Sequence, residues 1–165
     1  MEGELSHVDA SGAARMVDVG QKPVSIRTAK ASGKVRMAPA TLEKITSGAI
    51  AKGDVISSAR LAGIMAAKRT DELIPLCHSL PIDAVNLNIA PSGSCCLEIE
   101  SSVTTTGKTG VEMEALVAVS VACLTIYDMC KSIDRAMTIE EVCLLQKTGG
   151  VHGDYHRVAA TKETV

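Results

Sequence analysis

The sequence is nearly devoid of aromatic side chains: it has no Phe, no Trp and only two tyrosines, Tyr127 and Tyr155. Proteins that bind single-stranded nucleic acid without sequence preference stack the bases on aromatic rings, and grooves for proline-rich peptides are lined by the same rings. Two tyrosines are too few to build either surface. We therefore expect neither function, and we expect a core made of Val, Ile, Leu, Ala and Met.

An excess of positive charge is absent as well. The sequence has 17 Lys and Arg residues against 19 Asp and Glu residues, which gives a formal net charge of −2. This balance argues against a general nucleic-acid binder and against a polybasic membrane binder. We expect no nucleic-acid partner and no membrane partner.

The sequence also lacks a run that would cross a bilayer. The longest apolar run, around 115–129, is interrupted by Ser120 and Thr125 and reaches Asp128, so it predicts a buried helix instead. Residues 1–15 carry several charges and no apolar segment typical of a secretory signal. We therefore expect a cytoplasmic protein. The six cysteines form no CxxC pair, and in a reducing compartment most of them are expected to be small buried residues.

No internal repeat or linker is visible, so the 165 residues are expected to form one domain, 1–165, with flexible tails at about 1–5 and 158–165. Residues 24–37 contain Val, Ile and Thr with Gly33 interrupting, and they predict either a strand pair or one bulged strand. Helical spacing follows from Pro39 to about position 50, and again from 55 to 66, where Asp54 is placed to cap the helix.

The second half of the chain predicts a hairpin, a long helix and a last strand. Apolar and polar residues alternate at 85–89 and at 97–99, on either side of a turn at 91–94. A helix is expected from about 111 to 133 and a strand from 138 to 145. The order β-α-β-β-α-β predicts an α+β fold of the ferredoxin-like kind, in which an antiparallel sheet packs on helices.

A glycine-rich turn at 107–110 contains Lys108 and Thr109. A P-loop is excluded because Ser102 stands where the first Gly of GxxxxGK[ST] is required and because the motif follows a hairpin strand. Two glycines before a helix leave backbone N–H groups free. The segment is therefore either an anion site or only a strand-to-helix turn.

Charged residues lie at both ends of the predicted long helix. Asp128 and Lys131 share one face near its end, where spacing alone favours a surface ion pair and partial burial would favour acid–base chemistry. Glu112 and Glu114 lie in the first turn, where the helix dipole stabilises negative charge. Seventeen residues of continuous helix separate Glu114 from Lys131, or about 25 Å, so one small ligand cannot contact both within a single chain.

The histidines give little support for a metal site. His78 has no Cys or His partner at a zinc-ligand spacing. His152 and His156 have the i,i+4 spacing of a helical metal pair, but the glycines around them disfavour a helix. We expect no bound metal.

Several segments carry long ungapped motifs. The main ones are LIPLCH at 73–78, GKTGVEMEAL at 107–116, LTIYDMCK at 124–131 and KTGG at 147–150, and shorter ones lie at 16–19, 52–54 and 62–68. Together they closely resemble the MoaC family, the cyclic pyranopterin monophosphate synthases of molybdenum cofactor biosynthesis. The resemblance runs from about Ser6 to Arg157, nearly the whole chain.

The resemblance implies a lyase that acts on 3′,8-cyclo-7,8-dihydroguanosine 5′-triphosphate. The purine-derived five-membered ring is opened and rebuilt into a pyranopterin, and a cyclic phosphate forms as diphosphate leaves. The family implies no resident cofactor, and the sequence leaves open whether Mg²⁺ accompanies the triphosphate.

The resemblance also implies roles for individual residues. Asp128 and Lys131 match the central acid–base residues, and Lys52 completes the catalytic set. The substrate contacts of the family match Leu76, Cys77, His78, Glu112, Met113 and Glu114. Its triphosphate-binding residues match Lys22, Arg27 and Lys147.

The family further implies a homohexamer built as a trimer of dimers. With the 25 Å separation, this predicts that the Glu114 and Lys131 of one site come from different subunits, at a dimer interface. The chain departs from the family pattern at Ser79, where Pro is frequent, and at Val151, where many members have Lys. The second departure puts a phosphate role for that position in doubt.

Two other functions stay open on the sequence. One is a metal-dependent phosphohydrolase that uses His78, His152 and His156. The other is a regulatory nucleotide- or pterin-binding module, in which the Asp128–Lys131 pair would be structural.

Overall fold

The computed structural model describes residues 12–151 and 153–158 of the chain. Its elements, in chain order, are β1 (Ser25–Arg36), α1 (Pro39–Thr46), α2 (Val55–Ala67), α3 (Thr70–Leu73), β2 (Ile82–Pro91), β3 (Cys96–Gly107), α4 (Glu112–Cys130), β4 (Thr138–Thr148) and β5 (Tyr155–His156). The strands form one sheet in the order β2-β3-β1-β4-β5, and all neighbouring pairs are antiparallel. The predicted α+β, ferredoxin-like arrangement is confirmed.

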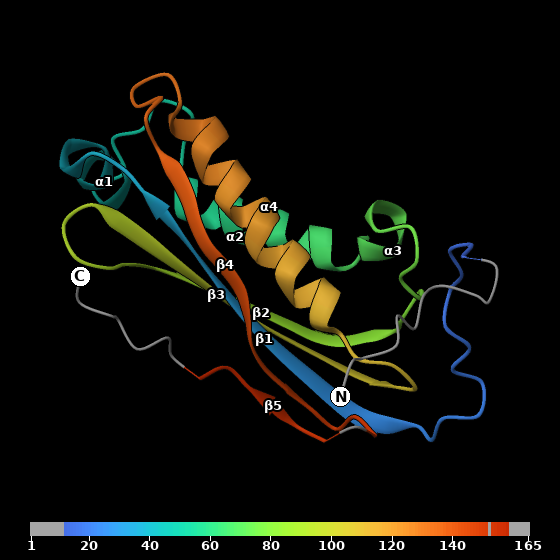
Figure 1. The fold of residues 1–165 in the computed structure, drawn as a ribbon. Coiled ribbons are helices and arrows are strands. Elements are labelled where there is room, and N and C mark those ends of the chain that lie inside the picture. The colour runs from blue at the N-terminus through green and yellow to red at the C-terminus, as the bar shows by residue number, and fades with distance from the viewer. Residues whose placement is uncertain (1–11, 152, 159–165) are drawn as a thin grey trace.

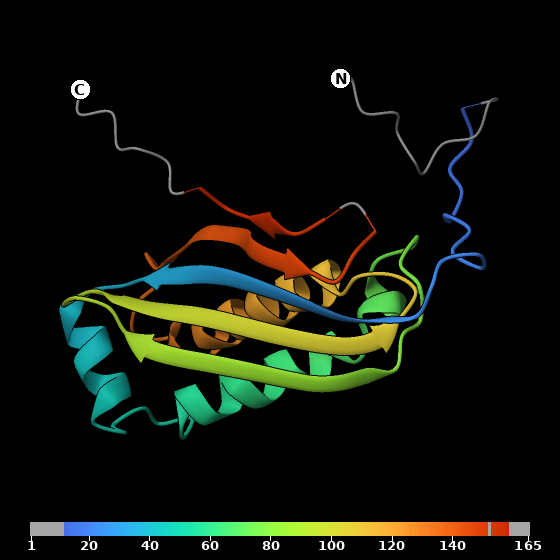
Figure 2. The same cartoon turned by 90° about the horizontal axis from the view of Figure 1, so that it is seen from below.

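The long helices cover one face of this sheet and leave the other open (Figures 1 and 2). The burial pattern of the strands follows from this arrangement, because alternate residues point to the helices. On β1 the buried apolar residues are Ala29, Ala31 and Val35, and on β3 they are Cys96, Leu97, Ile99 and Val103. Together with the inner faces of α2 and α4, these side chains form the core.

Helix α4 is apolar around much of its circumference because it packs against both the sheet and α2. Its length and hydropathy would suit a membrane span, but 56% of its apolar window is buried inside the molecule. Burial explains its composition. Gly33 on β1 lets this helix approach closely, since a Cβ there would lie 2.6 Å from Val119 Cγ1.

The region 24–37 is one strand, the second of the two alternatives, and its pairing with β4 has register shifts near Gly33. The long helix ends at Cys130, earlier than predicted, because the N–H groups of Ile133 and Asp134 both turn back to the Cys130 carbonyl. Strand β4 continues to Thr148, beyond the predicted end, and the short β5 was not predicted. The predicted tails, 1–5 and 158–165, lie outside the described residues except for Val158, which is exposed.

Candidate active site

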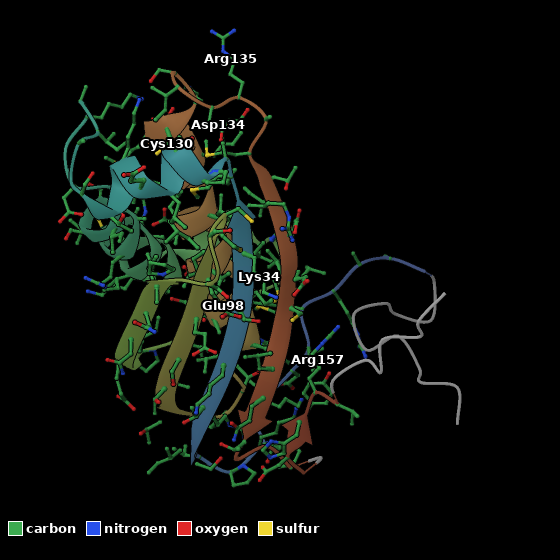
Figure 3. The ribbon with its side chains drawn as sticks, turned by 90° about the vertical axis from the view of Figure 1, so that its left-hand side faces the viewer. Lys34, Glu98, Cys130, Asp134, Arg135 and Arg157 are labelled. Atoms are coloured by element: carbon green, nitrogen blue, oxygen red, sulfur yellow. The ribbon has the colours of Figure 1, made fainter. Side chains whose placement is uncertain are left out.

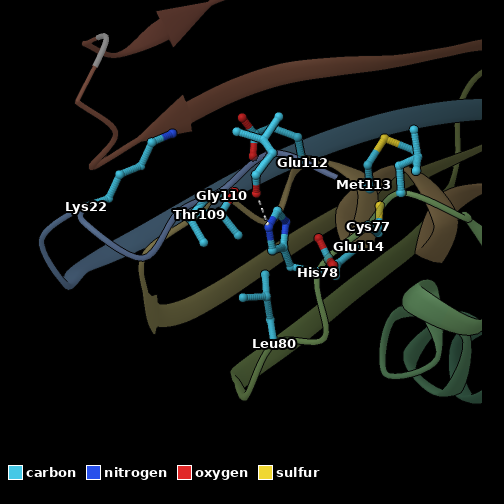
Figure 4. A pocket seen from close by; sticks show the side chains of 12 residues that line it. Lys22, Cys77, His78, Leu80, Thr109, Gly110, Glu112, Met113 and Glu114 are labelled. Carbon is cyan, nitrogen blue, oxygen red and sulfur yellow. Dashed lines mark hydrogen bonds between the residues drawn. The ribbon is translucent and has the colours of Figure 1, made fainter. Parts of the chain in front are cut away.

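A cavity of about 390 Å³ opens at the N-terminal end of α4 (Figure 4). Three separate segments line it: an N-terminal stretch before β1, the loop between α3 and β2, and the first turn of α4. The lining residues are Val17, Val19, Lys22, Leu76, Cys77, His78, Leu80, Thr109, Gly110, Glu112, Met113 and Glu114. Leu76, Cys77, His78, Glu112, Met113 and Glu114, which the family resemblance matches to substrate contacts, therefore line one cavity.

Glu114 is the chemically unusual group of this cavity. Only 4% of its surface is exposed, and burial raises the pKa of its carboxyl to about 7. Burial also raises the pKa of the neighbouring Cys77 thiol. The ring of His78 is held by a hydrogen bond of 2.8 Å between Nε2 and the Val17 carbonyl. At neutral pH the Glu114 carboxyl is therefore partly protonated, so it can either donate or accept a proton.

A second, smaller cavity of about 100 Å³ adjoins the first and shares Lys22, Thr109, Gly110 and Glu112 with it. Arg27 and Lys147 enter from β1 and β4. Lys147 Nζ lies 3.0 Å from Glu112 Oε1. This part of the site is rich in cations, as a phosphate-binding region needs to be.

Arg27 stands out in this second cavity because only 5% of its surface is exposed. Its Nε donates to the Gly107 carbonyl at 3.0 Å, while its buried Nη2 has no hydrogen-bond partner among the described residues. Buried guanidinium N–H groups are normally satisfied, so the free group is suited to an anionic ligand.

The predicted acid–base residues lie together at the opposite end of α4. Asp128 Oδ1 is 2.7 Å from Lys131 Nζ, and Lys52 Nζ donates to the Asp128 carbonyl at 2.8 Å and to its Oδ2 at 3.2 Å. These hydrogen bonds lower the pKa of Asp128, and the bond from Lys131 has the largest effect. The same bond raises the pKa of Lys131. At neutral pH the cluster is therefore a carboxylate held by two ammonium groups.

A cavity of about 390 Å³ lies beside this cluster, lined by Lys52, Tyr127, Lys131, Ser132 and Arg135. Sequence reasoning did not assign Ser132 or Arg135 to the site, since nothing in the local pattern marks a turn residue as a lining residue. Val17, Val19 and Leu80 were likewise missed at the other end. Thr109 and Gly110 belong to the glycine-rich turn 107–110, for which the sequence left an anion site open, and both line the two adjoining cavities.

The structure thus divides the predicted residues into two groups on one chain. The cavity-lining group and the adjoining cations lie at the start of α4, and the acid–base cluster lies at its end. His78 belongs to the first group, His156 lies on β5, and His152 is outside the described residues. No group of three His, Cys, Asp or Glu side chains able to hold a metal occurs in the described part of the chain.

The fold is therefore an α+β fold of ferredoxin-like topology, with a cation-rich cavity at the start of α4 and a cluster of one carboxylate and two lysines at its end. The family model of the MoaC family matches residues 16–150, and the chain belongs to this family. It is 60% identical over 156 residues to "Cyclic pyranopterin monophosphate synthase 1" of Mycobacterium tuberculosis (strain H37Rv), covering 94% of this chain and 92% of that protein. It is 58% identical over 155 residues to the cyclic pyranopterin monophosphate synthase of Chloroflexus aggregans, covering 93% and 94%.

Proposed function

We propose that this chain is a cyclic pyranopterin monophosphate synthase of molybdenum cofactor biosynthesis. Its substrate would be 3′,8-cyclo-7,8-dihydroguanosine 5′-triphosphate, and its products cyclic pyranopterin monophosphate and diphosphate. The observation that carries the proposal is the family match over residues 16–150, which contains every residue of the two clusters described above. The chemistry of those clusters suits this reaction, step by step.

The triphosphate would bind in the smaller cavity. Lys22, Arg27 and Lys147 supply three positive charges there, and the unpartnered NH2 group of Arg27 is available to a phosphate oxygen. Bond formation to the α-phosphorus expels diphosphate, and fixed cations stabilise the negative charge that develops on this leaving group. Any Mg²⁺ would arrive with the triphosphate, and we propose no resident cofactor.

Asp128, Lys131 and Lys52 would move the protons. Ring opening and reclosure require a base to accept protons and an acid to return them. The lowered pKa keeps Asp128 ionised as an acceptor, while the raised pKa keeps Lys131 protonated as a donor. Lys52, bonded to the same carboxylate, supplies a second ammonium group.

A complete site would need two chains. The cavity at the start of α4 and the acid–base cluster at its end cannot reach one small substrate within a single protomer. We propose that the cluster of one protomer faces the cavity of its partner, in a dimer that assembles into a homohexamer. We propose a reaction in the cytoplasm, with no nucleic acid and no membrane involved.

The decisive experiment is incubation of the purified protein with the cyclised dihydro-GTP. Cyclic pyranopterin monophosphate and diphosphate should appear together, in equal amounts. Chromatography with fluorescence detection of the oxidised pterin follows one product, and an enzyme-coupled assay follows the other. A folded sample that forms neither product would contradict the proposal.

A further inference from the structure

Helix α1 has no cap of its own at its N-terminal end. Its N-cap residue is Ala38, whose side chain offers no acceptor to the free N–H groups of the first turn. A carboxylate from a distant part of the chain binds at this end instead, to the N–H of the N-cap residue and to a side chain of the first turn. Asp134 Oδ2 accepts hydrogen bonds from the Ala38 N–H, at 2.9 Å, and from Thr41 Oγ1, at 3.1 Å.

The same residue is tied to the end of α4. The backbone N–H of Asp134 donates to the Cys130 carbonyl at 3.1 Å, so Asp134 closes the turn that begins with Lys131. Its second carboxylate oxygen, Oδ1, accepts from the Ala136 N–H at 3.1 Å. Figure 3 shows Asp134 beside Cys130, between the loop that follows α4 and the start of α1. One carboxylate therefore joins the end of α4 to the beginning of α1.

Helix α1 leads to Lys52 through the short loop 47–54. The backbone hydrogen bonds of this loop are local, such as those from Ala49 to Lys44 and from Gly53 to Ile50. Its placement against α4 therefore depends on side-chain packing. Residues 49–52 share a small cavity of about 120 Å³ with Met129, Ser132 and Ile133. How α1 sits on the turn after α4 is therefore one restraint on where Lys52 lies relative to Asp128, and the packing of α2 on α4 is the other.

We propose that Asp134 is a positioning residue for the acid–base cluster: by tying the start of α1 to the turn after α4, it holds Lys52 Nζ within hydrogen-bond reach of Asp128. Asp134 itself does not line the cavity beside the cluster. Its effect on turnover would pass through Lys52. The expected effect of Asp134 on turnover rests on the proposed function. Its expected effect on the position of Lys52 rests on the hydrogen bonds alone.

Kinetics of paired variants test the catalytic consequence. Asp134→Ala should lower kcat about tenfold or more and leave KM within about twofold, because misplaced catalytic groups slow the chemical step while the substrate-binding cavities are untouched. Asp134→Asn keeps one acceptor and should lose less. Glu140→Ala is the matched control: Glu140 also accepts side-chain hydrogen bonds, from Arg36 and Thr138, but on the open face of the sheet.

A double-mutant cycle separates positioning from general destabilisation. In a Lys52→Ala chain, adding Asp134→Ala should lower kcat by less than about twofold, since the group that Asp134 positions is already gone. An equal loss of kcat with and without Lys52 would overturn the proposal. So would a Glu140→Ala variant that loses as much kcat as Asp134→Ala at a matched fall in melting temperature.

A labelling experiment without substrate keeps this inference independent of the proposed function. Limited acetylation with peptide mass spectrometry measures the reactivity of Lys52 relative to the exposed Lys30 on β1. Freed from Asp128, Lys52 should react about threefold faster in Asp134→Ala and Asp134→Asn than in the wild type or Glu140→Ala. Unchanged Lys52 reactivity would overturn the positioning role even if turnover of the wild type is observed. A wild type without turnover but with the expected labelling would contradict only the proposed function.

Discussion

Glu114 and Lys131 lie at opposite ends of one uninterrupted helix, α4, which places them about 25 Å apart in the same chain. The first lines the cavity at the start of the helix and the second lines the cavity at its end. A single small substrate therefore cannot contact both residues within one protomer.

Co-assembly of two inactive chains should restore activity. In a dimer that pairs a Glu114→Ala chain with a Lys131→Ala chain, one of the two sites recovers both residues. Random pairing of equal amounts should give about one quarter of wild-type turnover, and each variant alone should stay near background. Co-expression with two affinity tags and sequential purification isolates the mixed species. Recovery no greater than in either parent would exclude sites shared between subunits.

Asp128→Asn should abolish turnover while leaving substrate binding intact. The amide cannot accept a proton, so kcat should fall about 10²- to 10⁴-fold, whereas the triphosphate contacts remain. Calorimetric titration and turnover measured on one sample separate the two effects. This result also distinguishes an enzyme from a regulatory binding module, for which no turnover exists to lose.

The chain provides a close control for that substitution. Glu72 pairs with Arg69 at 2.7 Å with i,i+3 spacing, the same distance and spacing as the pair of Asp128 and Lys131, and with similar exposure. Glu72→Gln should therefore leave kcat unchanged. Equal losses in the two variants would indicate that breaking any such surface pair is enough.

Stability should depend on pH through Glu114. Burial raises its pKa from 4.5 to about 7 in the folded protein, so the folded state holds a proton that the unfolded state has released. Stability is therefore lost as pH rises from about 4.5 to 7, by roughly 3 kcal/mol at most. Glu114→Gln removes this titration. Relative to the wild type, its melting temperature should rise by a few degrees between pH 5 and pH 8, and parallel curves would show that Glu114 does not titrate as described.

Arg27→Met should weaken substrate binding more than it slows chemistry. The change removes a buried cation with a free N–H group, so KM should rise about tenfold or more with a smaller change in kcat. Arg36→Met serves as the control, since Arg36 lies on the same strand but pairs with Glu140 away from the cavities. A KM that rises equally in both variants would point to a distortion of β1.

Much of this arrangement could be predicted from the sequence. Apolar and polar residues alternate in the hairpin strands, and the long helix is continuously apolar, so the local sequence predicts both types of element. The length of the helix alone predicts the separation of Glu114 from Lys131. The bond of Lys52 to Asp128 was accessible only through the family resemblance. No local pattern relates these residues, because their contact depends on how the loop 47–54 packs on α4.

The parts that could not be predicted depend on tertiary contacts. The N-terminal stretch that contributes Val17 and Val19 has no periodicity, and it is placed by distant groups such as His78 and by Lys108, which donates to the Gly20 carbonyl at 2.6 Å. The hydrogen bond between Asp134 and the backbone at the start of α1 joins residues 96 positions apart. Contacts between residues so far apart in the sequence form only when the backbone has folded. Helical and strand periodicity, in contrast, predicts the local structure of neighbouring residues.

The position of Tyr127 has a practical consequence for spectroscopy. With no Trp in the sequence, near-ultraviolet emission comes only from Tyr127 and Tyr155. Tyr127 lines the cavity beside the acid–base cluster and donates to the Arg135 carbonyl at 3.3 Å, whereas Tyr155 lies on the edge strand β5. A Tyr155→Phe protein would therefore carry a single native fluorophore, whose quenching reports directly when a ligand enters that cavity.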